Sequence, residues 1–538
     1  MNKFFSLFLL YTLSLSLSAT PAKPPRLVVG LVIDQMRSDY LQRYWNRLGE
    51  GGFKRLVNQG YVYKNAHYNY VPTYTGPGHA SIFTGATPRQ HGIVANDWYV
   101  RNSKQNQYCA LDTTVKGVGN EGLEGKMSPR HLLCNTIGDE LKLATNGQGK
   151  VFGFSLKDRG AILSAGHAAN GAFWMESREG KFISSNWYMQ KLPDWVQAFN
   201  EKKLVKSYLE QGWKTLYPIE TYTASIGDNN AYETIGDGNS TPTFPYGYGY
   251  AIGNQRYGTI RNTPHGNSIL VDLSMACIAS ENLGKDETTD HLVISFSTPD
   301  IVAHAYGPRS VEVEDIYLRL DKEIERLLNY LDAQVGKGHY LLFLTADHGG
   351  ADVPVHLQDL KMPGEYLTDF TIKKIIKREM ARVYGDSLLV AAVENAQVFF
   401  DVARANQRNL SLQQLERTTT DLLRNTKGIG AVYTREQLIG STEAYAQLLL
   451  NGYHDALSGD VVFMLLPAWM DHGQKGTTHG SGYNYDTHVP LLFYGASIPK
   501  GENYKQVFIT QIAPTVCELM KIHQPSCSYS ELLTELLH

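Results

Sequence analysis

Two short segments of the sequence place acids and histidines where they could bind a metal ion. Asp300 and His304 are four residues apart, so on a helix their side chains face the same way and could hold one ion. Alone, this pair is more simply explained as a helix-capping aspartate and a hydrogen-bonded histidine. Asp347 and His348 directly follow an apolar run, where packing does not explain them, because burying a charge without a partner is costly.

Other candidate ligands occur at similar places along the chain. Asp34 ends an apolar run near the start, and His479 lies in the polar segment GTTHG, with His488 just before the last apolar run. Three aspartates and three histidines could bind a pair of divalent ions through oxygen and nitrogen, for which zinc is the best candidate. Each residue has an ordinary structural explanation, so the prediction rests on their occurring together.

The segment TYTGPGHAS, residues 73–81, places a hydroxyl group beside a turn. Pro77 and Gly78, followed by a helix-compatible stretch, predict a turn that opens a helix with Thr75 at its N-terminus. Free backbone N–H groups at that position favour an anionic oxygen or a phosphate. By itself Thr75 would be interpreted as an N-cap residue, and only the candidate metal site makes it a candidate nucleophile.

Apolar runs before these residues predict strands that are buried on both faces of a parallel sheet. Helical spacing between the third and fourth runs gives a strand–helix–strand unit, which implies parallel neighbours. The sequence therefore predicts an α/β fold with a doubly wound, mostly parallel sheet and helices on both faces. In such sheets functional groups gather beyond the carboxyl ends of the strands, where three of the runs deliver an aspartate. The runs are 27–33, 151–156, 292–297, 340–344 and 489–493, and the helix is 311–333.

Two stretches interrupt this pattern within one catalytic domain, predicted to span residues 24–538. Residues 168–266 are rich in Tyr, Gly, Asn and Pro and show little periodicity, whereas residues 354–469 contain helical segments of their own, such as 410–424. We interpret both as insertions that form the walls of the active site and determine its substrate specificity. The glycines of GYGYAIG, residues 247–253, have no strand before them and no helix after them, which argues against a nucleotide-binding loop.

The composition is that of an exported globular protein. A formal net charge of −3 argues against a broad nucleic-acid-binding surface. Residues 1–19 combine a lysine, an apolar run diluted by Ser and Thr, and small residues at the end, which predicts a secretory signal peptide and a periplasmic or secreted protein. The run is shorter than the ~20 residues that a membrane span needs, so we expect no membrane association after cleavage.

Five cysteines are few for 538 residues, and export permits disulfides. Their spacing makes Cys109–Cys134 and Cys517–Cys527 possible pairs and leaves Cys277 free, although spacing alone does not establish the pairing. The sequence contains no CxxC motif, which excludes a thiolate zinc knuckle.

Taken together, these motifs resemble the alkaline phosphatase superfamily, and within it the PafA-type bacterial alkaline phosphatases that use a threonine nucleophile. The resemblance runs from the first apolar run to the last, nearly the whole mature chain. It is carried by Asp34, Thr75 in TGPGH, Asn96 in ANDWY, Lys157 and Arg159 in SLKDR, Asp300 and His304, Asp347 and His348, and His479 in GTTHG.

The resemblance implies a role for each of these residues. Asn96, Lys157 and Arg159 would contact the phosphoryl oxygens; in an extended segment the lysine and the arginine, two residues apart, would point the same way. The expected zinc ligands are Thr75, Asp34, Asp347 and His348 for one ion, and Asp300, His304 and His479 for the other, with His488 as the alternative to His479.

The implied function is hydrolysis of small-molecule phosphate monoesters by a monomer, through a phosphothreonine intermediate at a two-zinc site. The nearest alternative is a phosphodiesterase or nucleotide pyrophosphatase of the same superfamily. Diesters carry one less charge, so the cationic pair Lys157 and Arg159 favours monoesters. A sulfatase would need a C/S-x-P-x-R motif, which TGPGH lacks. A non-catalytic metal-binding protein on this scaffold is a further alternative, disfavoured because no ligand is missing.

Overall fold

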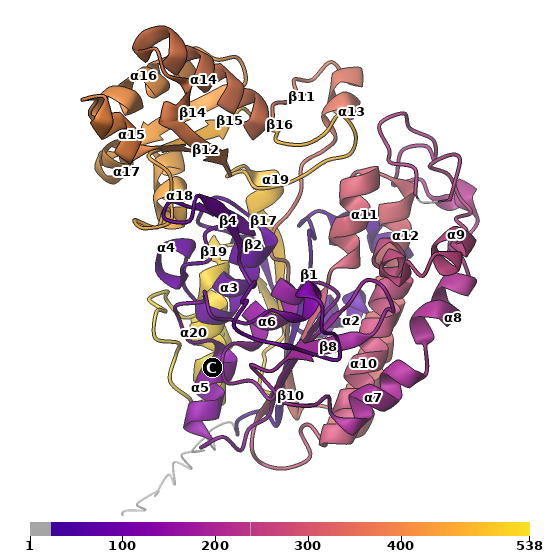
Figure 1. Cartoon of the computed structure of the whole chain (residues 1–538). Helices are drawn as coiled ribbons and strands as arrows, with labels where there is room; N and C mark the ends of the chain where they lie inside the picture. The colour runs from indigo at the N-terminus through magenta and orange to yellow at the C-terminus, as the bar shows by residue number, and fades with distance from the viewer. Residues whose placement is uncertain (1–22, 237, 538) are drawn as a thin grey trace, which may run out of the picture.

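A central sheet of eleven strands forms the core of the protein (Figure 1). The computed structural model describes residues 23–236 and 238–537, and the signal peptide predicted at 1–19 lies outside this range. The order across the sheet is β18 (Gly501–Asn503), β2 (Tyr61–His67), β17 (His488–Gly495), β10 (Tyr340–Thr345), β1 (Leu27–Ile33), β9 (Asp290–Phe296), β6 (Val151–Ser155), β7 (Gly171–Met175), β8 (Phe182–Ser185) and β5 (Gly117–Val118), with β19 (Val507–Phe508) paired to β2.

The middle of this sheet is parallel. Strands β10, β1, β9, β6 and β7 all run in one direction, so their carboxyl ends meet at one edge. In the register of these strands, Ile33 is paired with Phe296 and Val32 with Thr345, which brings the ends of three strands side by side. The predicted strand at 489–493 is present as β17, but it runs antiparallel to β10. The sheet is therefore parallel where the candidate residues emerge and mixed towards its sides, where β17–β2, β7–β8 and β8–β5 are antiparallel and β18–β2 is parallel.

Helices cover both faces, which confirms the predicted α/β, doubly wound class. Figure 1 shows one group on the side of α3, α5, α6 and α20, and another on the side of α10 and α12. The predicted helix at 311–333 is α12, which is α-helical to Leu331 and continues as a π-helical turn. The bounds are α3 (Thr75–Thr84), α5 (Ile137–Ala144), α6 (Asp158–Ala165), α20 (Ile512–Met520), α10 (His265–Glu281) and α12 (Val311–Leu331).

Residues 365–470 form a separate lobe above the core (Figure 1). It has its own four-stranded sheet and its own apolar core, and the short strands β11 and β16 pair at its base. The lobe occupies most of the segment predicted as the second insertion, 354–469. Its elements are β11 (Glu365–Tyr366), α14 (Asp369–Tyr384), β12 (Val390–Glu394), β13 (Gln397–Phe400), α15 (Val402–Gln407), α16 (Leu412–Arg424), β14 (Ile429–Thr434), α17 (Arg435–Gly440), α18 (Ala444–Gly452), β15 (Val461–Leu465) and β16 (Trp469–Met470).

The segment predicted as the first insertion, 168–266, begins inside the core. Its first residues form β7 and β8 of the central sheet, and only the later part lies outside it. That later part packs two short helices, α7 (Asp194–Glu201) and α8 (Leu204–Glu210), against α10, and a third, α9 (Gly249–Gly253), against α8. The two strands are short and fully buried. They could not be predicted because the composition of the segment as a whole is typical of turns.

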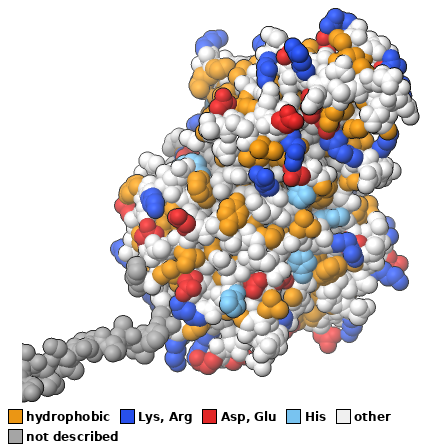
Figure 2. Space-filling view, turned by 90° about the vertical axis from the view of Figure 1, so that its left-hand side faces the viewer, with side chains coloured by type: hydrophobic (Ala, Val, Ile, Leu, Met, Phe, Trp, Pro, Cys, Tyr) orange, Lys and Arg blue, Asp and Glu red, His pale blue; other side chains and the backbone are white. Residues whose placement is uncertain are grey.

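The outer surface agrees with the weak net charge of the sequence. Figure 2 shows basic and acidic side chains interspersed over the face that it presents, without a continuous basic patch. Within the part of the chain that the structure describes, every helix falls short of the length and apolar character that a bilayer crossing requires.

Neither of the two pairs that cysteine spacing made possible, Cys109–Cys134 and Cys517–Cys527, is present. Cys134 is bonded to Cys527, which lies 393 residues further along the chain, whereas Cys109 and Cys517 are buried free thiols. The free state of Cys277 is confirmed. The C-terminal helix α20 packs against α5, and this packing brings together two cysteines that no local spacing connects.

Removing this disulfide should destabilise the protein. We expect the double variant Cys134→Ser, Cys527→Ser to lose about 2–4 kcal/mol, because the cross-link closes a very long loop in the unfolded chain. Thermal unfolding checks this as a lower Tm, and a reducing agent should lower the Tm of the wild type equally while leaving the double variant unchanged. A reductant-sensitive double variant would contradict the assignment.

Candidate metal centre and active site

Three strand ends bring acids and histidines together at the parallel edge of the sheet. Asp34 follows β1, and Asp347 and His348 follow β10; each offers a ligand atom, and these atoms all lie within 4.8 Å of one another. All three side chains are fully buried. The apolar strands before them therefore position the acids, as the sequence predicted.

The polar atoms of this first group fit a bound cation. Among the residues that the structure describes, Asp34 Oδ1, Asp347 Oδ2 and His348 Nε2 are buried without a hydrogen-bond partner. Leaving three such atoms unpaired in the interior would be costly, whereas a divalent ion would satisfy all of them. The chemistry of this donor set, two carboxylates and one imidazole, suits zinc.

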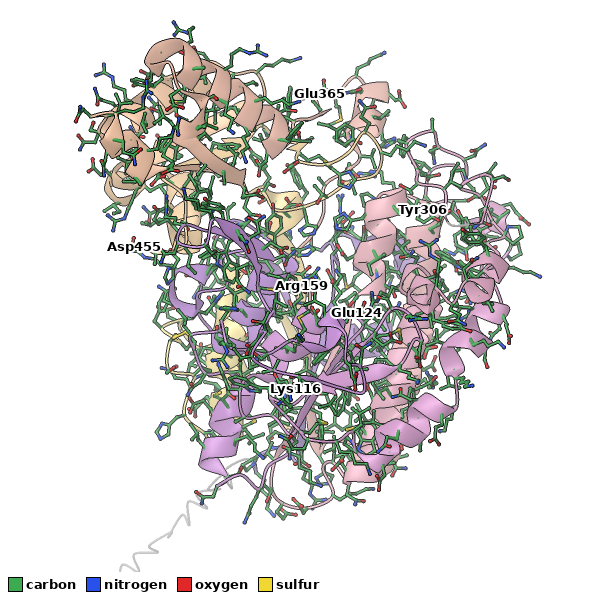
Figure 3. The ribbon with its side chains drawn as sticks, viewed as in Figure 1. Lys116, Glu124, Arg159, Tyr306, Glu365 and Asp455 are labelled. Carbon is green, nitrogen blue, oxygen red and sulfur yellow. A yellow bond between two sulfur atoms is a disulfide. The ribbon has the colours of Figure 1, made fainter. Side chains whose placement is uncertain are left out.

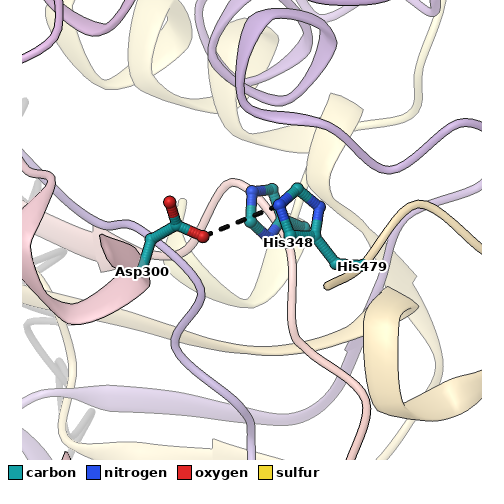
Figure 4. Close-up of side chains that lie close together, drawn as sticks. All are labelled: Asp300, His348 and His479. Atoms are coloured by element: carbon teal, nitrogen blue, oxygen red, sulfur yellow. Dashed lines mark ion pairs between the residues drawn. The ribbon is translucent and has the colours of Figure 1, made fainter. Parts of the chain in front are cut away.

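A second group surrounds Asp300 (Figure 4). Asp300, His348 and His479 also offer atoms within 4.8 Å of one another. Asp300 lies in helix α11 (Thr298–Tyr306), and its Oδ1 is 3.1 Å from His304 Nε2 and 3.6 Å from His479 Nε2. The His348 ring stacks on His479 with centroids 3.4 Å apart, so the two groups are adjacent. The three residues predicted for the second ion thus lie together.

The same hydrogen-bond pattern orients each of the three histidines. Nδ1 of His304 is 2.6 Å from the Thr477 carbonyl oxygen, and Nδ1 of His348 is 2.9 Å from that of Gly349. Nδ1 of His479 is 2.8 Å from a third carbonyl oxygen, that of Thr73. A proton on Nδ1 that is donated to a carbonyl leaves Nε2 as a lone-pair donor, the arrangement of metal-binding histidines. Burial also lowers the pKa of His348 to about 4, which keeps its ring neutral as a ligand must be.

The alternative ligand His488 lies elsewhere. It begins β17, its Nε2 is 3.0 Å from the Lys64 carbonyl oxygen, and its ring stacks on His67 with centroids 4.6 Å apart. The structure therefore places His479, and not His488, beside Asp300.

Thr75 is the first residue of α3 and is buried, with 1% of its surface exposed. The N-cap position belongs to Tyr74, so the simpler explanation of Thr75 as an N-cap does not hold. The helix starts close to the first metal-binding group because residue 78 is glycine: a Cβ there would lie 2.3 Å from the Asp347 carbonyl oxygen. His79 connects the two, with Nδ1 2.9 Å from the Thr75 carbonyl oxygen and 3.4 Å from Asp347 Oδ2.

Lys157 lies between the two groups of ligands. Its Nζ is 2.6 Å from Asp34 Oδ2 and 2.6 Å from Asp300 Oδ2. Burial lowers the pKa of Lys157, but the charges of Asp300 and Asp34 outweigh burial and raise it above its ordinary value. Burial and the charge of Asp34 raise the pKa of Asp347 well above its usual range. An excess of buried negative charge therefore marks this centre as a place for cations.

Arg159 and Asn96 approach from other elements. Arg159 lies in the first turn of α6 and Lys157 just before it, so the predicted extended segment is wrong (Figure 3). Helix α6 starts at Asp158, directly after the strand. Asn96 Oδ1 accepts a hydrogen bond of 2.7 Å from Gly76 N, next to Thr75, which leaves the amide NH₂ of Asn96 as a donor.

Two neighbouring residues were missed by the sequence analysis. Gln35 connects the two ligand groups: its N donates to Asp347 Oδ1 at 3.2 Å and its Nε2 to Asp300 Oδ1 at 2.7 Å. Its backbone has φ 60°, a strained conformation for a residue other than glycine. Tyr108 OH is 3.2 Å from Arg159 Nη1. Neither has a sequence signal apart from Gln35 following Asp34.

Comparisons with known proteins identify the family of this chain and several relatives. Residues 28–489 match the family model described as type I phosphodiesterase / nucleotide pyrophosphatase. Alkaline phosphatase PhoV of Synechococcus elongatus is 43% identical, over 95% of this chain and 93% of the relative. Alkaline phosphatase PafA of Elizabethkingia meningoseptica is 42% identical, over 95% and 94%. A protein of Myroides odoratus named calcium-transporting ATPase is 41% identical, over 95% and 94%.

Solved structures give the same result. The crystal structure of alkaline phosphatase PafA superimposes with a TM-score of 0.94 at 41% identity and covers 96% of this chain and 100% of its own. Human ectonucleotide pyrophosphatase / phosphodiesterase 5, at 13% identity and a TM-score of 0.52 over 92% of this chain and 95% of its own, shares the fold.

Proposed function

This chain belongs to the type I phosphodiesterase / nucleotide pyrophosphatase family as an enzyme of the alkaline phosphatase kind, and we propose that it hydrolyses phosphate monoesters at a two-zinc site with Thr75 as its nucleophile. The observation that carries the proposal is the set of buried, unpaired ligand atoms on Asp34, Asp347 and His348, close to the start of the Thr75 helix. We also propose that the enzyme acts as a monomer on small-molecule substrates.

The ligands divide into two sets. Asp34, Asp347 and His348, together with the Thr75 hydroxyl, would hold one zinc ion. Asp300, His304 and His479 would hold the other. When bound, zinc lowers the pKa of a coordinated hydroxyl group and stabilises negative charge on the oxygen that departs.

The chemistry of the chain itself is a double displacement. Thr75 Oγ gives up its proton to water and attacks phosphorus, the ester P–O bond breaks, and the departing oxygen takes a proton from water, so that one proton passes in net from the threonine to the alcohol. Water then attacks the phosphothreonine, which restores the threonine hydroxyl and releases inorganic phosphate. The dipole of helix α3, whose positive end lies at Thr75, favours the developing negative charge.

The phosphoryl oxygens would be held by three side chains. Lys157 lies between Asp34 and Asp300. Its positive charge would offset the negative charges of these carboxylates and of the bound phosphoryl group. The amide NH₂ of Asn96 and the guanidinium of Arg159 would each donate to a non-bridging oxygen. Positioning and electrostatics of this kind supply most of the rate acceleration in phosphoryl transfer.

The cationic pair distinguishes a monoesterase from the phosphodiesterase alternative. A monoester dianion has one more charged oxygen than a diester, and Arg159 together with Lys157 would supply the positive charge that this oxygen needs. Turnover of p-nitrophenyl phosphate should therefore exceed turnover of bis(p-nitrophenyl) phosphate in the wild type. Faster diester turnover would refute the monoester assignment.

Replacing Arg159 by alanine should reduce monoester hydrolysis selectively. We expect kcat/KM for p-nitrophenyl phosphate to fall about 10²- to 10³-fold, because a charged donor to the transition state is lost. The diester, which lacks the extra charge, should change less than about tenfold by the same argument. Steady-state kinetics with both substrates checks this, and the exposed Arg178→Ala serves as the control. Equal losses on both substrates would contradict the role of Arg159.

Export is part of the proposal. The composition of residues 1–19 supports a cleaved signal peptide, and the disulfide Cys134–Cys527 is consistent with an oxidising compartment. The intact mass of protein recovered from the periplasm or the culture medium would show whether cleavage occurs near residue 19.

A further inference from the structure

A small hairpin connects the candidate phosphate-binding residues with the lobe. It consists of β3 (Asp97–Val100) and β4 (Gln105–Tyr108), paired antiparallel with Asp97 opposite Tyr108. Asn96 directly precedes it, and Cys109 N donates to the Asn96 carbonyl oxygen at 2.8 Å. Asn96 and Tyr108 are therefore held together at the base of one element.

The base of the hairpin holds two of the three side chains proposed to bind phosphate, those of Asn96 and Arg159. Asn96 Oδ1 is fixed by Gly76 N at 2.7 Å. The Tyr108 hydroxyl donates to Asp158 Oδ1 and accepts from Arg159 Nη1 at 3.2 Å, whereas Arg159 Nε is buried without a partner among the described residues. A shift of the hairpin base would therefore move Asn96 directly and Arg159 through Tyr108.

At the outer end of the hairpin, Arg101 forms an ion pair with Asp460 of the lobe. Arg101 donates to Asp460 Oδ2 at 3.1 Å and Oδ1 at 3.0 Å, and to the Ser458 carbonyl oxygen at 3.1 Å. Its guanidinium lies over the Phe399 ring, 5.0 Å from the centroid. The Asp460 side chain is only 10% exposed. This ion pair therefore has two hydrogen bonds of good geometry and is partly shielded from water, unlike most surface ion pairs.

Two further contacts extend the same attachment. Tyr99 packs edge-on against Phe399 with centroids 5.2 Å apart. Asn395 Nδ2 donates to the Asp97 carbonyl oxygen at 2.7 Å, one residue from Asn96. The lobe thus contacts the hairpin both at its far end and beside a candidate phosphate ligand.

We propose that the lobe sets the positions of Asn96 and Arg159 through this hairpin, so that Arg101 is a positioning residue that determines preference for phosphate monoesters. This inference rests on the proposed function, because it needs Asn96 and Arg159 to bind the phosphoryl group. Reacting groups must be held closely: a displacement of about 1 Å caused by a distant mutation can cost roughly 10²-fold in rate. A purely structural attachment would instead affect all substrates equally.

The test compares Arg101→Ala with wild type on p-nitrophenyl phosphate and bis(p-nitrophenyl) phosphate. We expect monoester kcat/KM to fall about 5- to 30-fold, with a similar weakening of inhibition by inorganic phosphate, by the positioning argument. Diester kcat/KM should change less than about twofold by the same argument, and bound zinc should be unchanged. Arg382→Ala is the matched control, since it breaks an exposed Arg–Glu pair of the lobe, with Glu379, that lies within helix α14.

A double-mutant cycle separates positioning from general destabilisation. If Arg101 acts through Asn96 and Arg159, adding Arg101→Ala to the double variant Asn96→Ala, Arg159→Ala should cost less than about threefold further, because the effects share one path. Tyr108→Phe, which removes only the hydroxyl that holds Arg159, should reproduce the selective loss even if Arg101→Ala folds poorly. Additive losses, or equal losses on both esters, would overturn the inference. A wild type without monoester turnover would instead refute the proposed function.

Discussion

Replacing Thr75 by alanine should reduce kcat/KM for p-nitrophenyl phosphate by about 10³- to 10⁵-fold, the scale of losing a covalent nucleophile. The side chain is buried at the start of α3, where Gly78 lets the helix approach Asp347 closely. Removing its hydroxyl deletes the atom that would attack phosphorus but leaves Asp34, Asp347 and His348 in place. Zinc content, measured by mass spectrometry of the metal, should therefore remain close to that of wild type.

A conservative variant gives the matched control. Thr75→Ser keeps the hydroxyl and should stay within about tenfold of wild type, because the reacting atom is unchanged. Acid quenching during turnover, followed by peptide mass spectrometry, should find phosphate on Thr75 in the wild type and none in Thr75→Ala. If Thr75→Ala retains activity within tenfold, or if phosphate is found on another residue, the covalent mechanism is refuted.

The middle of the fold could be predicted because its signal is local. The run at 27–33 is a strand with those bounds, and the runs that precede Asp300 and Asp347 are its two neighbours in the sheet. A short continuous apolar run is typical of a strand covered on both faces, and parallel strands bring their carboxyl ends to one edge. The convergence of the three aspartates follows from these two facts.

Other features depend on contacts between distant parts of the chain. The bond between Cys134 and Cys527 is made by the packing of α20 on α5, and no spacing rule reports that packing. The direction of β17 follows from how the chain returns after the lobe, and its composition does not reveal it.

The same limit applies around the active site. Tyr108 reaches Arg159 only because the hairpin folds back beside α6, about fifty residues later in the chain. Gln35 occupies a positive φ that is not typical of glutamine, a local strain that composition does not signal. The sequence therefore indicates the candidate residues of the active site more readily than the residues that position them.

Removing the metal should abolish activity, with a loss of about 10³-fold or more and recovery on adding zinc, since metal coordination activates the nucleophile and stabilises the leaving group.

Two histidines of the same region provide a matched pair for testing the zinc ligands. His479 Nε2 is 3.6 Å from Asp300 Oδ1, whereas His488 is hydrogen-bonded to Lys64 and stacked on His67. We expect His479→Ala to bind about one zinc ion per chain and to lose most of its activity, because a zinc site needs three protein ligands and here keeps only two. His488→Ala should bind two and remain active. Metal analysis together with monoester kinetics decides the matter: equal zinc content in the two variants, or full activity after exhaustive chelation, would exclude the assigned centre. Calcium in place of zinc would also contradict it, because imidazole nitrogens that are freed by Nδ1 hydrogen bonds are ligands that calcium rarely uses.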